Sequence, residues 1–181
     1  LSNRNLIING AMQVAQRGTS SSVTDNSYAT LDRFRLTHNG TDEAPTQQQI
    51  NLDSSDTGPY ETGFRNAFKI TNGNQTGGAQ ANDFIRISTM LEGQDIANSG
   101  WNYLSTSSFL TLSFWVKSSV AQNFYSFIRS TDGTMYQYPF ETGSLTANTW
   151  TKVTKTIPGN SNLQFDNNVG GAFALWIHQF S

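Results

Sequence analysis

The sequence contains no cysteine. This absence excludes disulfides, thiolate metal sites and cysteine nucleophiles. It leaves the compartment open, because a chain without thiols tolerates any redox potential. Histidine is nearly as scarce, since His38 and His178 are the only two. With so few imidazoles and no G-x-S-x-G motif, the sequence offers neither a recognisable hydrolytic triad nor a recognisable zinc site.

Charge is also low. Asp, Glu, Lys and Arg make up 13% of the 181 residues, and the formal net charge is −2. Soluble domains usually carry roughly 25% charged residues. Basic residues do not outnumber acidic ones, so the sequence predicts no basic surface that would bind nucleic acid. No apolar run approaches the roughly 18 residues of a membrane span. We therefore expect neither nucleic acid nor a membrane as a partner.

Uncharged polar residues take the place of the missing charges, since Ser, Thr, Asn and Gln form more than a third of the chain. The 12 Phe, 6 Tyr and 4 Trp argue against disorder. The length suits a single domain. We expect residues 1–30 to form an N-terminal strand and a Ser/Thr-rich loop or arm, packed on a β-sandwich of residues 31–181. Because the chain begins at Leu1 and stops one residue after an apolar run, we expect both ends to be cuts in a longer polypeptide.

Short apolar runs alternate with Gly-, Asn-, Ser- and Asp-rich turns, and helical periodicity is almost absent. This pattern predicts an all-β protein, a two-sheet antiparallel β-sandwich of the jelly-roll type, with at most one or two short helical turns around residues 88–95. The predicted strands are 6–8, 34–37, 46–51, 67–71, 84–88, 111–117, 124–129, 136–140, 150–157 and 173–180.

Two predicted strands place a tryptophan on the face opposite their apolar residues. In residues 110–117, Leu112 and Phe114 share one face and Trp115 lies on the other; in residues 173–180, Trp176 and His178 lie opposite the apolar set. Three interpretations stay open: a loop or the N-terminal arm covers both tryptophans, they form a subunit interface, or they form a platform on which a sugar ring stacks.

Four further aromatic residues are candidates for ligand contact. Trp101 and Tyr103 lie near predicted loops, and Tyr136 and Tyr138 alternate along one strand with Phe140. Alternation puts the last three on one face, which can equally be core or interface.

Carboxylate pairs give no convincing chemistry. Asp53 and Asp56 could hold a calcium ion but lack the loop pattern of a calcium hand, and a turn closed by Asp side chains is the simpler interpretation. Glu92 and Asp95 could serve as glycosidase acid and base only if the fold faced them across a cleft. We therefore expect no cofactor and no metal, no catalytic residues, and a protein that is not an enzyme.

Several segments resemble one group of proteins in a consistent order. They are residues 4–19 (RNLIINGAMQVAQRGT), 31–34 (LDRF), 90–96 (MLEGQDI), 110–117 (LTLSFWVK), 150–154 (WTKVT) and 172–180. Together they span most of the length of the chain and resemble C-terminal modules of tail fibres from marine and cyanobacterial bacteriophages, which are similar to galactose-binding sandwiches. The first segment is specific, whereas the Ser-Phe-Trp-Val-Lys piece is shared by many carbohydrate-binding jelly rolls.

The resemblance implies a homotrimeric appendage of an extracellular virion, with other virion proteins and host-surface glycan as partners. It supplies no binding residues. Members of that group run on into another strand and an acidic, Pro-containing tail, which this sequence lacks. The expected function is host attachment or assembly of the fibre tip. The alternatives are a carbohydrate-binding module of a secreted bacterial glycosidase or adhesin, and a capsid decoration protein.

Overall fold

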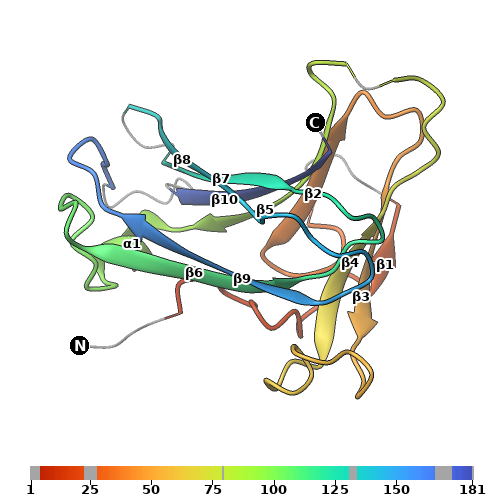
Figure 1. Cartoon of the computed structure of the whole chain (residues 1–181). Helices are drawn as coiled ribbons and strands as arrows, with labels where there is room; N and C mark the ends of the chain where they lie inside the picture. The colour runs from red at the N-terminus through yellow and green to blue at the C-terminus, as the bar shows by residue number, and fades with distance from the viewer. Residues whose placement is uncertain (1–4, 23–27, 79, 131–133, 166–172, 181) are drawn as a thin grey trace. The chain divides into compact units, whose positions relative to one another are not determined.

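The computed structural model describes residues 5–22, 28–78, 80–130, 134–165 and 173–180, the last range by its backbone alone (Figure 1). Its elements confirm the all-β class. In chain order they are β1 (Ser20–Ser21), β2 (Phe34–Asn39), β3 (Thr46–Asn51), β4 (Asn66–Thr71), β5 (Phe84–Leu91), α1 (Gly93–Ala97), β6 (Phe109–Val116), β7 (Tyr125–Ser130), β8 (Tyr136–Glu141), β9 (Thr151–Pro158) and β10 (Phe173–Phe180).

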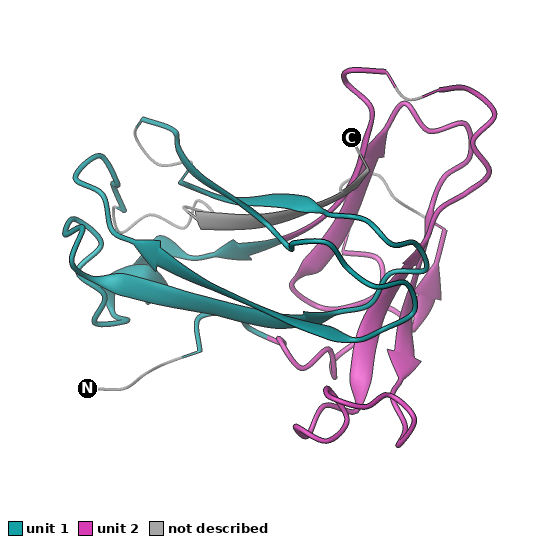
Figure 2. Ribbon diagram, viewed as in Figure 1, with its two compact units in different colours: residues 1–8, 89–176 teal, residues 9–88, 177–181 magenta. Residues whose placement is uncertain are grey.

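The strands form several antiparallel sheets, as an all-β sandwich requires. The strand orders are β1-β3-β4, β2-β5-β10-β7-β8 and β6-β9. Among the described residues the strands pair as three hydrogen-bonded sheets, since the ribbon β6-β9 and the group β1-β3-β4 are separate ladders. The chain divides into two compact units, residues 1–8 with 89–176 and residues 9–88 with 177–181 (Figure 2).

The first unit contains the ribbon β6–β9 and the hairpin β7–β8. Along β6, Leu112 is buried whereas Thr111 and Ser113 are exposed, which confirms the predicted alternation. On β9, Val153 and Ile157 are buried, and the Thr residues next to them, Thr154 and Thr156, are exposed on the opposite face. The core of this unit is therefore supplied by one face of each strand.

The second unit contains the three-stranded sheet β1-β3-β4 and the strand β2. Leu31, Leu36 and Ile85 are almost fully buried in it. Gln47 of β3 is also fully buried, and its side-chain oxygen accepts a hydrogen bond from the Thr30 hydroxyl at 2.9 Å. A buried amide of this kind is tolerated because it is hydrogen-bonded.

Two sequence-based boundaries are corrected. Residues 6–8, predicted as a strand, lead into a turn instead. Asn9 adopts a positive φ of 57°, and its side-chain oxygen accepts hydrogen bonds from the backbone N–H groups of Gln13 and Val14, so the side chain closes a turn. The predicted helical turn lies later than expected, because β5 continues to Leu91 before α1 begins at Gly93. No described helix has the length and apolarity needed to cross a membrane.

Candidate functional site

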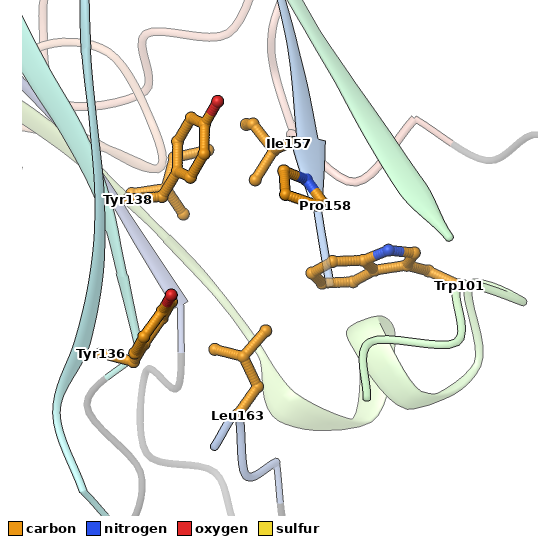
Figure 3. A pocket seen from close by; sticks show the side chains of 7 residues that line it. Trp101, Tyr136, Tyr138, Ile157, Pro158 and Leu163 are labelled. Carbon is orange, nitrogen blue, oxygen red and sulfur yellow. The ribbon is translucent and has the colours of Figure 1, made fainter. Parts of the chain in front are cut away.

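The first unit contains a small hollow with aromatic walls (Figure 3). Its volume is about 10 Å³, which is close to the space that one water molecule needs. Three of the sequence-predicted ligand residues meet here. The lining residues are Trp101, Ile128, Tyr136, Tyr138, Ile157, Pro158 and Leu163.

Strand alternation places the two tyrosines. Tyr136 and Tyr138 of β8 share a face, and in the register of the hairpin they lie opposite Ser130 and Ile128 of β7. Ser130 and Ile128 are buried, so this face of the hairpin is the inner one. Both tyrosines are half-buried, as side chains at the margin of a core would be. In Figure 3 their rings stand across the hollow from Trp101 and Pro158.

The tyrosine hydroxyls and Asn160 form the polar part of the margin, which we call the tyrosine rim (Tyr136, Tyr138 and Asn160). The Asn160 side-chain Nδ2 donates a hydrogen bond to the Tyr136 hydroxyl at 2.7 Å. The Asn160 Oδ1 accepts from the backbone N–H of Asn162 at 2.9 Å, which fixes the orientation of the amide. The Tyr138 hydroxyl donates to the backbone oxygen of Thr156 at 3.3 Å.

These bonds leave the two hydroxyls with complementary capacities. The Tyr136 oxygen accepts from Asn160, so its own hydrogen stays available as a donor. The Tyr138 hydrogen is committed to Thr156, so its oxygen stays available as an acceptor. The rim can therefore donate one hydrogen bond and accept another, next to two aromatic rings.

Trp101 and Tyr103 have a mainly structural position. Trp101 is only 7% exposed, and its indole N–H donates to the backbone oxygen of Ser108 at 3.2 Å. Tyr103 does not line the hollow. Its ring packs edge-on against Trp101, with centroids 6.2 Å apart, and against Phe165, with centroids 4.8 Å apart. A buried tryptophan held in this way forms a wall of the hollow and offers no open face for stacking.

The loop after β9 meets the loop that carries Trp101 and Tyr103. The backbone N–H of Gly159 donates to the oxygen of Ser108 at 2.9 Å, and that of Asn160 donates to the oxygen of Tyr103 at 2.8 Å. A Cβ added at Gly159 would lie 2.5 Å from the backbone oxygens of both Tyr103 and Ser105. Only glycine permits this approach, which sets the position of Asn160 in the rim.

The remaining sequence-predicted ligand residues do not join the hollow. Trp115 lies on β6 opposite Lys152 of β9, half-buried on the face that also carries Thr111 and Ser113. Trp176 and His178 lie on β10, and their side chains are outside the described part of the chain. The three interpretations of the Trp115 and Trp176 faces stay predictions.

The carboxylate pairs lie as the simpler interpretations expect. Asp53 Oδ1 accepts hydrogen bonds from the backbone N–H and the hydroxyl of Ser55, at 2.8 and 2.6 Å, which is a turn closed by an Asp side chain. Glu92 is the N-cap residue of α1, and Asp95 lies in the first turn of the same helix, so the pair does not face across a cleft. No group of three or more potential metal-ligating His, Asp or Glu residues occurs within the described ranges.

The sequence does not point to Leu163, which completes the hollow, or to Asn160, which donates a hydrogen bond to the Tyr136 hydroxyl at its margin. Leu163 and Asn160 belong to the loop after β9, and neither stands in a motif that marks a site. The Pro158-Gly159 pair is a turn signal in the sequence, and the loop that supplies both residues begins there.

No protein-family model matches the chain, and the curated proteins contain no match to it. Among solved structures, it is similar to the enzymatically active domain of tailspike protein 4 of bacteriophage CBA120, with 15% sequence identity and a TM-score of 0.47. The alignment covers 87% of this chain and 18% of the other, so the chain spans less than a fifth of that protein's length. A likeness at this level concerns the β-rich fold alone.

The comparison corrects one expectation. The sequence leads us to expect a protein that is not an enzyme, but the solved domain to which the chain is similar is named as enzymatically active. An all-β fold of this kind does not by itself exclude catalysis, since unrelated functions occur on one fold. The expectation is therefore withdrawn.

Proposed function

We propose that the chain is a virion module of a bacteriophage tail appendage, of the tail-fibre type, and that its tyrosine rim contacts a host-surface glycan. The observation that carries the glycan part is the pairing of one free donor and one free acceptor beside two half-buried rings. Sugars present hydroxyl groups and an apolar C–H face together, and aromatic residues with a few polar groups are suited to both.

The size of the hollow decides how a sugar would bind. A space of about 10 Å³ admits no pyranose ring. The ring would lie across the rim, with its C–H face against the tyrosines and one substituent directed into the hollow, where it would displace a water molecule. Binding of this kind is shallow, and we expect a weak single-site affinity, strengthened when several copies act together.

The tail location rests on the segments that resemble tail-fibre modules, above all residues 4–19. The low charge is consistent with it, because a surface of hydroxyl and amide groups depends little on the salt outside a cell. The neighbouring sequence in the parent polypeptide tests this part. A fibrous shaft upstream supports it, and a glycosidase or adhesin domain there would contradict it.

A glycan array tests the binding part. We expect wild type to bind at least one class of bacterial surface saccharide. Tyr138→Phe keeps the ring but removes the acceptor, and a lost hydrogen bond of about 1 kcal/mol weakens binding about fivefold. Tyr103→Phe, whose hydroxyl is not part of the rim, is the matched control and should bind like wild type. The glycan proposal fails if wild type binds nothing, or if Tyr138→Phe binds as well as wild type.

Catalysis needs a separate readout. Release of reducing ends from each bound saccharide, measured over time, separates binding alone from binding with cleavage.

A further inference from the structure

The outward face of the hairpin β7–β8 carries a second set of aromatic and polar side chains. Ser126, Ile128 and Ser130 are buried, so the alternate residues of β7 point away from the core. The register of the hairpin places three cross-strand pairs on this outward face: Tyr125 with Glu141, Phe127 with Pro139, and Arg129 with Gln137. Tyr136 and Tyr138 lie on the opposite face, so this surface is distinct from the tyrosine rim.

Tyr125 is the more accessible of the two aromatic residues of this face. Its side chain is 61% exposed, as much as any large hydrophobic side chain in the described residues. Directly opposite, Glu141 is also exposed. An exposed aromatic ring beside a carboxylate combines a flat apolar surface with a strong hydrogen-bond acceptor.

The Glu141 carboxylate is held in place. The Asn123 side-chain Nδ2 donates to Glu141 Oε2 at 2.6 Å. The Asn123 segment is itself tied to the end of β8, because the backbone N–H of Thr142 donates to the oxygen of Phe124 at 2.9 Å and the N–H of Phe124 donates to the Thr142 hydroxyl at 3.0 Å. The second carboxylate oxygen, Oε1, accepts no hydrogen bond from the described residues.

At the other end of the face, the Arg129 side chain is also held by its neighbours. The Arg129 guanidinium lies 4.7 Å from the centroid of the Phe127 ring, and its Nη2 donates to the Gln137 side-chain oxygen at 3.2 Å. Phe127 and Pro139 thus form the centre of the face. The hydrogen-bonded pair of Asn123 and Glu141 lies at one end, and that of Arg129 and Gln137 lies at the other.

We infer that this face is a second saccharide-contacting surface, centred on Tyr125 and Glu141. A sugar ring would lay its C–H face on Tyr125, and Glu141 Oε1 would accept a hydrogen bond from one of its hydroxyl groups. The class of ligand is a neutral saccharide, since an acidic sugar would bring a second negative charge to the Glu141 carboxylate. A partner protein fits less well, because it would have to desolvate Glu141 and Arg129 together.

Amide chemical shifts during a titration with neutral monosaccharides, chiefly galactose, glucose and mannose, test this inference. We expect shifts at Asn123, Tyr125 and Glu141. Tyr125→Ala and Glu141→Gln should each weaken this response at least fivefold, whereas Tyr125→Phe, which keeps the ring, should largely preserve it. Tyr138→Phe should leave it unchanged. Circular dichroism confirms that each variant is folded.

Three outcomes overturn the inference. Shifts confined to the tyrosine rim would leave the proposed glycan contact standing and remove the second surface. If none of the sugars shifts any amide signal, the second surface is likewise excluded. Shifts at Tyr125 that depend on protein concentration without sugar, together with a higher solution mass that Tyr125→Ala abolishes, would make this face a contact between copies of the chain.

Discussion

Asp42 shows how a single exposed carboxylate can join two loops. Its Oδ2 accepts hydrogen bonds from the backbone N–H groups of Thr76 and Gly77, at 2.6 and 2.9 Å, and from the Thr76 hydroxyl at 3.0 Å. These hydrogen bonds hold the pKa of Asp42 below its ordinary value of 3.8, and the bond from the Gly77 backbone N–H contributes most to this shift. Hydrogen bonds to the ionised form favour that form.

The sign of the pH effect follows from this direction. A carboxyl group whose pKa is lower in the folded state stabilises the fold fully above its unfolded pKa, and this contribution is lost as the pH falls through the folded value. We expect Asp42→Asn to unfold at a lower temperature than wild type above about pH 5, with a difference that narrows below about pH 4. Thermal unfolding followed by circular dichroism from pH 2 to pH 7 measures it. A difference that stays constant over this range would contradict the assignment.

Among the elements, the loop after β9 is set by one close approach. Alanine at Gly159 would place a methyl group 2.5 Å from two backbone oxygens, which no rotamer change can relieve. We expect Gly159→Ala to reduce the free energy of unfolding by about 1–3 kcal/mol, as overpacking does elsewhere. Urea denaturation measures the change.

Gly78→Ala is the matched control for this substitution. A Cβ at Gly78 would meet no atom within 4 Å, and the residue has no strained φ. Its free energy of unfolding should stay within about 0.5 kcal/mol of wild type. Equal stability of the two variants would show that the loops at Gly159 separate easily, and the rim would then not be fixed by this contact.

The strands themselves could be predicted from the sequence, because alternation reports directly on a half-buried strand. The bounds predicted for residues 46–51 and 173–180 agree with β3 and β10. The strand predicted for residues 6–8 is wrong because a short apolar run does not reveal that Asn9 closes a turn through its side chain. Local pattern carries no information on such a bond until the backbone is placed.

The candidate site could be predicted only in part, for a similar reason. Alternation put Tyr136 and Tyr138 on one face, and the structure agrees. Trp101 reaches the hollow, and Asn160 reaches the Tyr136 hydroxyl, through contacts between loops far apart in the chain, which no periodicity encodes. The outward pair Tyr125 and Glu141 was missed because it depends on the register of the hairpin, which the sequence leaves undetermined while the turn geometry is unknown.

At the scale of the whole molecule, assembly separates the proposed function from its alternatives. A tail-fibre module is expected to be a homotrimer, whereas a carbohydrate-binding module of a secreted enzyme is usually monomeric. We predict a solution mass of three chains by light scattering, with little change between low and high salt, because few charges are available to hold or repel the copies. A stable monomer at high protein concentration would favour the secreted module.

The proposed function requires that the tyrosine rim binds a glycan through one donor and one acceptor. Calorimetric titration of wild type and of Tyr136→Phe/Tyr138→Phe, with the saccharide that the array identifies, tests it most directly. Loss of two hydrogen bonds of about 1 kcal/mol each predicts a dissociation constant roughly 30 times larger for the double variant, with the rings still in place. Equal dissociation constants for the two proteins would contradict the claim.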